Sequence, residues 1–188
     1  MLFKNSERLS SWEKNMIYRS TFIWRDLATL ITLYLISAYA NLDDKEIIYK
    51  KMIETPVELG NYLRFFFRDE VANKYTDLFN LQILLIRNLM DAHMNGNIKQ
   101  INTKKKQLYN VTDERSTFLA KHNPFWQEEV LRSLLYNFIN LVFDQLIEFL
   151  NKDYIDSLNS FEKLMEQGSS LGDYFSQGVY QYLLSLKS

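Results

Sequence analysis

Histidine is scarce in this chain, and its two copies decide which metal chemistry the sequence can support. A di-iron carboxylate bundle takes a Glu-x-x-His pair from each of two helices, because each iron needs an imidazole besides several oxygen ligands. Neither His93 nor His122 has a glutamate three residues before it. Both lie beside expected helix ends, near Gly96 and Pro124, where histidines are typically exposed or capping residues. We therefore predict no metal-ligating or catalytic role for them.

The motifs of nucleophilic and phosphate-binding enzymes are also missing. Nucleophilic catalysis needs a hydroxyl, thiol or amine held against a base, but the chain has no cysteine and no Gly-x-Ser-x-Gly elbow. Neither the dinucleotide-binding nor the P-loop glycine pattern occurs. Gly168 and Gly172 superficially resemble part of a phosphate loop. Without a preceding strand, glycines four residues apart better indicate a helix face that a neighbouring helix can approach closely. We therefore expect a protein that is not an enzyme.

Several acids and amides remain as candidates for a polar interior, should the fold enclose a cavity. They are Asp26, Gln82, Asp113, Asn137, Asp144 and Asp173. The chain has 12 tyrosines, and buried tyrosine hydroxyls need hydrogen-bond partners that such acids and amides could supply. Aromatic residues such as Tyr34, Tyr39 and those at 65–67 could alternatively line a ligand pocket between helices. We expect most of these rings to fill the core instead.

Charge gives little reason to expect nucleic acid as a partner. The chain has 22 basic and 23 acidic side chains, so no global field attracts polyanions or anionic lipid. Lys99 and Lys104–Lys106 form the main basic concentration, and Asp113 and Glu114 follow it closely. Nucleic-acid binding usually needs a broader basic surface. We expect a solvated helix face here.

The elements that must position any site are helices, and one of them is unusually apolar. The 16 residues from Leu27 to Leu42 contain no charged side chain, yet Asp26 and Asp43 flank them. The run is shorter than the roughly 20 residues needed to cross a bilayer and too apolar for a surface helix. We therefore expect it at the centre of a helical bundle, covered on nearly every side. Association of this helix with a membrane surface is the weaker alternative.

Helix signals cover most of the chain. Its five glycines and two prolines are too few for a β-rich protein with many tight turns. Capping boxes at 43–46 and 55–58 predict two short helices, and Gly96 is expected to end a longer helix in the left-handed conformation. Apolar residues at helical spacing mark the longer helices. The expected helices are residues 10–40, 43–53, 56–67, 69–94, 98–121, 123–150 and 154–186.

These helices predict one all-α domain over residues 1–188, an up-and-down bundle with a four-helix core and additional short helices. Its general architecture would be similar to that of hemerythrin and ferritin. The composition, 47% hydrophobic and 24% charged residues, is typical of a globular protein. The absence of cysteine suits a reducing compartment, and Met1–Ser11 lacks the apolar stretch of a signal peptide. We therefore expect a cytoplasmic protein.

A series of short motifs runs through most of the expected helices. They are Trp24, Asn41-Leu42-Asp43-Asp44, Pro56, Tyr109, Asp113-Glu114, Asn123-Pro124-Phe125-Trp126 and Leu135-Tyr136. Over about residues 20–182, this series resembles a family of small all-helical bacterial proteins of unknown function. Some members of that family carry the name acetylglutamate kinase, which an all-helical sequence does not support. The resemblance implies a bacterial helical bundle.

In that family, several long helices have an acid close to a histidine, an arrangement that looks like an inward-facing metal or acid/base site. The matching positions here are Arg25 and Leu27, Leu81 and Gln82, and Asn137 and Phe138. The expected histidines are therefore gone, whereas Asp113, Glu114 and Asp173 persist. The resemblance implies a chain that has kept the scaffold and filled its polar centre.

Two classes of function follow from these observations. The first is a non-catalytic helical bundle that acts by binding a second copy of itself, another protein or a small apolar ligand, with no cofactor. The second is a divergent metal-binding or redox bundle that uses carboxylates such as Asp113, Asp144 and Asp173. The second class rests on the family resemblance alone.

Overall fold

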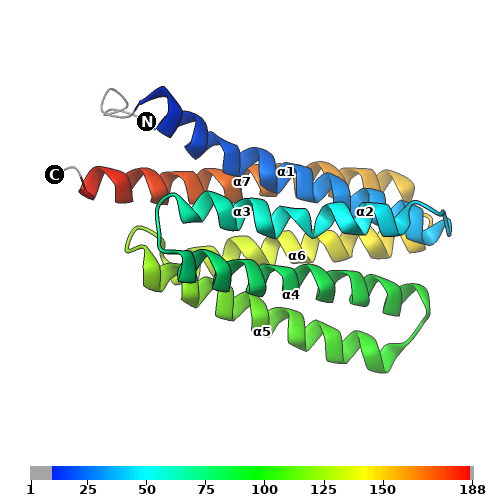
Figure 1. The fold of residues 1–188 in the computed structure, drawn as a ribbon. Coiled ribbons are helices and arrows are strands. Elements are labelled where there is room, and N and C mark those ends of the chain that lie inside the picture. Colours follow the sequence, from blue (N-terminus) through cyan, green and yellow to red (C-terminus); the bar gives the residue numbers. More distant parts are fainter. Residues whose placement is uncertain (1–9, 187–188) are drawn as a thin grey trace.

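The described residues form seven helices that lie side by side (Figure 1). Successive helices run in opposite directions, except that α3 continues in the direction of α2. The computed structural model describes residues 10–186, apart from the side chains of residues 12–14 and 16–17, and this part of the chain contains no strand. The prediction of an all-α bundle is confirmed. The helices are α1 (Ser11–Tyr39), α2 (Lys45–Met52), α3 (Glu54–Arg64), α4 (Asp69–Met94), α5 (Ile98–His122), α6 (Glu128–Leu150) and α7 (Tyr154–Leu186).

The helices form a closed ring in which neighbours pack against one another. α1 packs against α7, α7 against α6, α6 against α5, α5 against α4, and α4 against α3. The pair α2 and α3 closes the ring against α1. These two short helices follow each other in the same direction, so they take one place in the ring (Figure 1). They are thus part of the ring and not additions to a four-helix core.

A proline explains why α2 and α3 are separate helices. Pro56 has no N–H and cannot donate to the carbonyl four residues back, which belongs to Met52 at the end of α2. The two capping boxes predicted at 43–46 and 55–58 are wrong. The N-cap residues are Asp44 for α2 and Ile53 for α3, and neither makes a side-chain capping bond. The Asp44 carboxylate instead accepts a hydrogen bond from the Ser37 hydroxyl.

Other helix ends follow local hydrogen bonding. Gly96 ends α4 with φ +62°, which confirms the predicted left-handed cap. Helix α6 begins later than predicted, because Asn123 folds the chain into a turn before it. The Asn123 Oδ1 accepts from the Phe125 N–H at 3.0 Å, and the Asn123 carbonyl accepts from the Trp126 N–H at 3.0 Å. The Asn-Pro motif therefore precedes the helix instead of starting it.

The apolar run from Leu27 to Leu42 is not covered on nearly every side, contrary to the prediction. Ile31 and Leu35 are fully buried, whereas Leu33 is 46% exposed and Ile36 is 41% exposed. The reason is that α1 is one rod of the ring and has no helix on its outer face. The predicted burial thus applies to one face of the helix.

One helical stretch has the length and apolar composition that a membrane span requires. Among the described residues this stretch is Tyr18–Tyr39, and 44% of its most apolar window is buried. Core helices of soluble proteins pass the same test, so the stretch is weak evidence for a span.

Two glycines let α7 approach α1 closely. A Cβ atom on Gly172 would lie 2.2 Å from the Thr21 Cα, and one on Gly168 would lie 3.1 Å from the Trp24 carbonyl oxygen. The nearest atoms belong to the α1 backbone, which cannot rotate away as a side chain can. The predicted small-residue packing face is confirmed.

One hydrophobic core fills the ring and takes side chains from all seven helices. Its middle is aromatic. The Trp24 ring stacks on Phe79 at 5.2 Å between centroids and meets Phe138 edge-on at 5.5 Å. Such aromatic pairs contribute about 0.5–1.5 kcal/mol beyond the area they bury. The centre of the bundle is therefore a packed aromatic cluster.

Candidate functional site

The acids and amides predicted to line a polar interior do not come together. Gln82 alone among them is buried, Asp113 is half-buried, and the other four are exposed. Asn137 and Asp144 line a shallow groove between α6 and α7, and Asp173 accepts a hydrogen bond from Thr21 on the surface. Asp26 lies on the exposed side of α1. The described part of the chain thus has no cavity built from this set.

The polar group at the centre of the bundle is the guanidinium of Arg115, whose residue is 0% exposed. Its Nη2 donates to the Tyr75 hydroxyl at 2.6 Å, and its Nη1 donates to the Gln82 Oε1. Among the described residues no carboxylate pairs with it. Gln82 and Tyr75 both belong to α4, so the guanidinium links α5 to α4.

Aromatic rings surround this cation where a carboxylate would be expected. The Arg115 Cζ lies 3.8 Å from the ring centroid of Phe79, 5.1 Å from that of Tyr75 and 5.7 Å from that of Trp24. The negative ring faces attract the cation and partly replace its lost hydration. Burial lowers the pKa of Arg115 and raises the pKa of Tyr75. Arginine still keeps its proton in proteins, so a positive charge sits in the core.

The chemistry that this cluster can perform is limited. The Arg115 Nε and the Trp24 Nε1 are buried donors without a partner. None of the four clefts described for this surface is lined by either residue. The cluster also contains no histidine, acid or reactive hydroxyl besides Tyr75. We therefore assign it a structural role, the orientation of α4 against α5.

Sequence reasoning missed Arg115, although the sequence contains a signal for it. Leu108, Val111 and Leu119 mark the apolar face of α5, and all three are buried. Arg115 lies four residues after Val111 and four before Leu119, so helical spacing places it on the same face. An arginine inside an apolar stripe is rare enough to be singled out.

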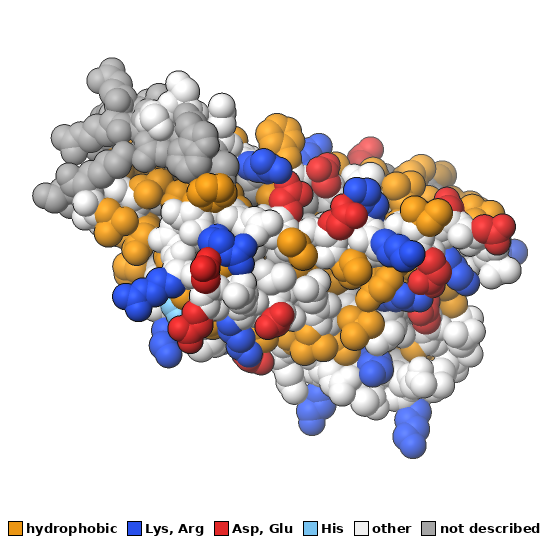
Figure 2. Space-filling view, viewed as in Figure 1, with side chains coloured by type: hydrophobic (Ala, Val, Ile, Leu, Met, Phe, Trp, Pro, Cys, Tyr) orange, Lys and Arg blue, Asp and Glu red, His pale blue; other side chains and the backbone are white. Residues whose placement is uncertain are grey.

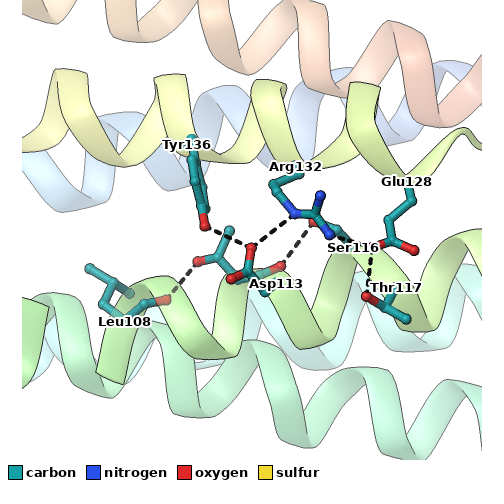
Figure 3. A network of polar contacts seen from close by, with 8 residues as sticks. Leu108, Asp113, Ser116, Thr117, Glu128, Arg132 and Tyr136 are labelled. Atoms are coloured by element: carbon teal, nitrogen blue, oxygen red, sulfur yellow. Dashed lines mark hydrogen bonds and ion pairs between the residues drawn. The ribbon is translucent and has the colours of Figure 1, made fainter. Parts of the chain in front are cut away.

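A second polar cluster lies on the surface between α5 and α6, as Figure 3 shows. Arg132 pairs with Asp113, Nε to Oδ1 at 3.0 Å, and also with Glu128. The Tyr136 hydroxyl donates to the same Asp113 oxygen at 2.7 Å. Burial and the Asp113 hydrogen bond raise the pKa of Tyr136 to about 12. Asp113 is therefore engaged by its own neighbours, and the cluster joins two helices.

The histidines make local contacts at helix ends. The His93 Nδ1 lies 2.8 Å from the Leu89 carbonyl oxygen, and the His122 Nδ1 lies 2.7 Å from that of Phe118. A carbonyl only accepts, so Nδ1 donates in both contacts. Within residues 10–186, no group of three or more His, Asp or Glu side chains could hold a metal ion.

An aromatic cleft opens at the end of the bundle where α4 begins and α5 and α7 end. Its volume is about 550 Å³. Rings from three segments line it, together with charged side chains from the first turns of α4. The lining residues are Phe66, Phe67, Arg68, Glu70, Val71, Lys74, Phe118, His122 and Tyr182. We call this feature the aromatic cleft.

Hydrogen bonds fix the register between the antiparallel helices α1 and α7. Three pairs are bonded, with donor–acceptor distances of 3.0 Å for Thr21–Asp173, 2.9 Å for Arg25–Ser169 and 3.5 Å for Thr29–Met165. Each step of four residues forward along α1 is thus matched by four residues backward along α7. Continuing this register places Ile36 opposite Leu158, and Tyr39 opposite Ile155.

Exposed apolar side chains therefore adjoin one another where α1 ends and α7 begins. The Tyr39 ring reaches Phe149 at 5.1 Å, and Phe149 reaches Tyr154 at 5.6 Å, which extends this surface. Hydrophobic side chains are visible at this end in Figure 2. We call the set the apolar face, with exposures between 41% and 78%; it consists of Leu33, Ile36, Tyr39, Tyr154, Ile155 and Leu158.

Comparison of the chain with known protein families, with curated proteins and with solved structures found no match. The family resemblance drawn from the sequence motifs therefore stays a prediction.

Proposed function

We propose that this protein is a cytoplasmic, non-catalytic helical bundle that acts by binding, and that its partner at the apolar face is a second copy of itself. The observation behind the proposal is the uncharged outer side of α1, where Leu33, Ile36 and Tyr39 are exposed together. Contiguous exposed apolar surface typically marks an interaction site. A fold that leaves this surface bare would be expected to cover it by association.

Self-association fits the chemistry of the face. In a twofold dimer the same patch meets itself, so the uncharged side of α1 would lie against another uncharged side. No isolated charge from the run Leu27–Leu42 would then be buried, which avoids the largest cost of forming an interface. The exposed carboxylates nearest in sequence, Asp43, Asp153 and Asp156, would remain at the rim.

The same carboxylates argue against a membrane surface as the partner. Peripheral helices that bind anionic lipid place lysine and arginine beside their apolar side. Here the exposed Asp43, Asp153 and Asp156 flank the apolar face and outnumber the exposed Lys152, so an anionic surface would on balance repel this part of the protein. We therefore favour a protein partner over a lipid one.

The carboxylate-based metal or redox alternative has less support. Asp113 is engaged by Arg132 and Tyr136, while Asp144 and Asp173 are exposed on other helices. No observation brings the three together. Elemental analysis of protein purified without chelator tests this alternative, and one equivalent of iron or manganese per chain would overturn the non-catalytic proposal.

The test of self-association compares two glutamate substitutions by size-exclusion chromatography with light scattering. Leu158→Glu changes a side chain of the apolar face that is 65% exposed, and Ile98→Glu changes one at the start of α5 that is 68% exposed. Burying a leucine side chain contributes about 2 kcal/mol, so the exposed two thirds contribute about 1.3 kcal/mol in each copy. Both copies lose it, which predicts about a hundredfold weaker dimer.

The wild type and Ile98→Glu are expected at twice the chain mass of 22.5 kDa, and Leu158→Glu at that mass itself. Circular dichroism should show the same helix content in all three proteins, because both positions are exposed. A wild type that is monomeric over a hundredfold range of concentration would overturn the proposal. Equal behaviour of the two variants would also overturn it.

A further inference from the structure

We propose that the aromatic cleft is a binding site for a small carboxylate with a flat apolar body, such as an aromatic acid. This inference goes beyond self-association and does not depend on it. The cleft involves Tyr182 near the end of α7, whereas the apolar face involves Leu158 near its start. At 1.5 Å per residue, these positions are about 36 Å apart.

The size and shape of the cleft suit a small molecule. Its volume of about 550 Å³ falls within the roughly 300–1,000 Å³ that ligand pockets usually have. Four segments build it: the chain between α3 and α4, the first turns of α4, the last turns of α5 and the end of α7. A cleft supported from several helices keeps its shape better than a groove along one helix.

The floor of the cleft is aromatic and is held in place by the core behind it. The Phe67 ring lies 5.0 Å from the Tyr182 ring and 5.8 Å from the buried Trp126 ring. Phe118, on the α5 side, lies 4.3 Å from the His122 ring. Rings that are fixed by neighbours offer a flat apolar ligand a stacking surface with little loss of conformational freedom.

The rim supplies an unpaired cation. Of the arginines whose side chains the structure describes, Arg68 is the one without a hydrogen bond or ion pair to any described residue. The others are held as follows: Arg19 by Glu58, Arg25 by Ser169, Arg64 by Asp69, Arg87 by Glu46, Arg115 by Tyr75 and Arg132 by Asp113. A free guanidinium at the rim of the aromatic cleft is suited to a carboxylate, which it can bind through two parallel hydrogen bonds.

The other polar groups at the rim leave this cation available. Lys74 also lines the cleft, but its Nζ lies 3.0 Å from the Glu114 carboxylate. The His122 Nδ1 donates to the Phe118 carbonyl, so Nε2 is left to face solvent or a ligand. Arg68 is also the N-cap of α4, and the helix dipole there favours a negative group. Glu70, which lines the cleft too, makes a second negative group less favourable, so we infer a monocarboxylate.

Isothermal titration calorimetry with 1-naphthoate tests the proposal, with 1-naphthalenemethanol as the uncharged probe of the same shape. The wild type is expected to bind the acid at least tenfold more tightly than the alcohol. Arg68→Gln should weaken naphthoate binding about tenfold, the usual effect of losing a hydrogen bond to a charged group, and should not affect binding of the alcohol. Arg25→Gln, an exposed arginine on α1, is the matched control and should bind as the wild type does.

Several results would overturn the assignment. They are equal affinity for acid and alcohol, no loss of affinity in Arg68→Gln, and no binding of naphthoate at millimolar concentration. Leu158→Glu is expected to bind naphthoate normally, and a loss there would instead place the ligand on the apolar face. Because Arg68 is exposed, its substitution is not expected to unfold the protein, and circular dichroism of the variant checks this.

Discussion

The buried guanidinium of Arg115 makes the fold depend on the amide of Gln82. Gln82→Leu keeps the size of the side chain but removes the oxygen that accepts from Nη1. The buried Arg115 guanidinium would then lose one of its two hydrogen-bond partners. Water cannot replace this partner, because Arg115 is 0% exposed. Hydrogen bonds to charged groups contribute about 1.5–3 kcal/mol. We expect the free energy of unfolding to fall by about 2 kcal/mol.

The same substitution should have a different effect when the charge is gone. In the background Arg115→Met, Gln82 is a buried amide without its donor, and Gln82→Leu removes that unsatisfied group. It should then be neutral or stabilising. The coupling energy between the two positions is therefore expected to be at least about 1.5 kcal/mol, which is large for a single pair.

Urea unfolding followed by far-ultraviolet circular dichroism measures all four proteins of this cycle. For a domain of this size, a loss of about 2 kcal/mol also lowers the melting temperature by roughly 4–8 °C. Gln177→Leu is the matched control, since Gln177 is exposed on α7. Its effect should stay within about 0.5 kcal/mol.

The reasoning would be refuted by a small or additive result. If Gln82→Leu costs less than about 0.5 kcal/mol, the guanidinium does not need the amide. If the cost is the same with Met at position 115, the two side chains do not interact. Either outcome would mean that Arg115 is solvated or paired in another way.

Three further predictions follow from the packing and the tyrosines. Gly172→Ala should lower the free energy of unfolding by about 1–3 kcal/mol in urea unfolding, because its Cβ would lie 2.2 Å from the Thr21 Cα. A loss below about 0.5 kcal/mol would contradict the close packing. Burial raises the pKa of Tyr34 and of Tyr136 to about 12, whereas tyrosines of the unfolded chain ionise near 10. The two protonated tyrosines therefore stabilise the folded state fully below pH 10, and this contribution is lost as the pH rises through 12. A free energy of unfolding that does not change between pH 9 and pH 12 would refute this prediction. Asp113→Asn should lower the pKa of Tyr136 in a carbon-13 titration and cost less than about 1 kcal/mol; an unchanged pKa would exclude the assigned hydrogen bond as its cause.

Most of the fold could be predicted from local patterns. Helices depend on contacts three and four residues apart, and glycine or asparagine at an end acts on its own turn. Gly96 is an example, since its left-handed conformation follows from its residue type and place. Prediction failed where a turn used a longer contact: the capping box expected at 43–46 did not form, and the side chain of Asp44, the N-cap residue of α2, bonds to Ser37 instead.

The candidate sites were harder to predict than the helices. Polar residue type alone pointed to Asp113 and Asp144 as interior groups. In the structure, Asp113 is half-buried and bonded to Tyr136 at the surface, and Asp144 is exposed. Arg115 was overlooked because arginine is usually exposed, although its spacing placed it on the buried side of α5. The aromatic cleft has no motif at all, since Phe67 and Tyr182 are far apart in the chain and meet only through packing.

The sequence by itself determined that this chain is all-α and that Gly168 and Gly172 would serve close packing. It also determined that the nucleophile-elbow and phosphate-binding motifs do not occur in it. These properties depend on residue type and short spacing, which the chain displays directly. Only the tertiary structure decided which polar group lies at the centre and which side of α1 stays bare. Both depend on how the ring closes, because a helix buries whichever side its neighbours happen to cover, and those neighbours come from distant parts of the chain.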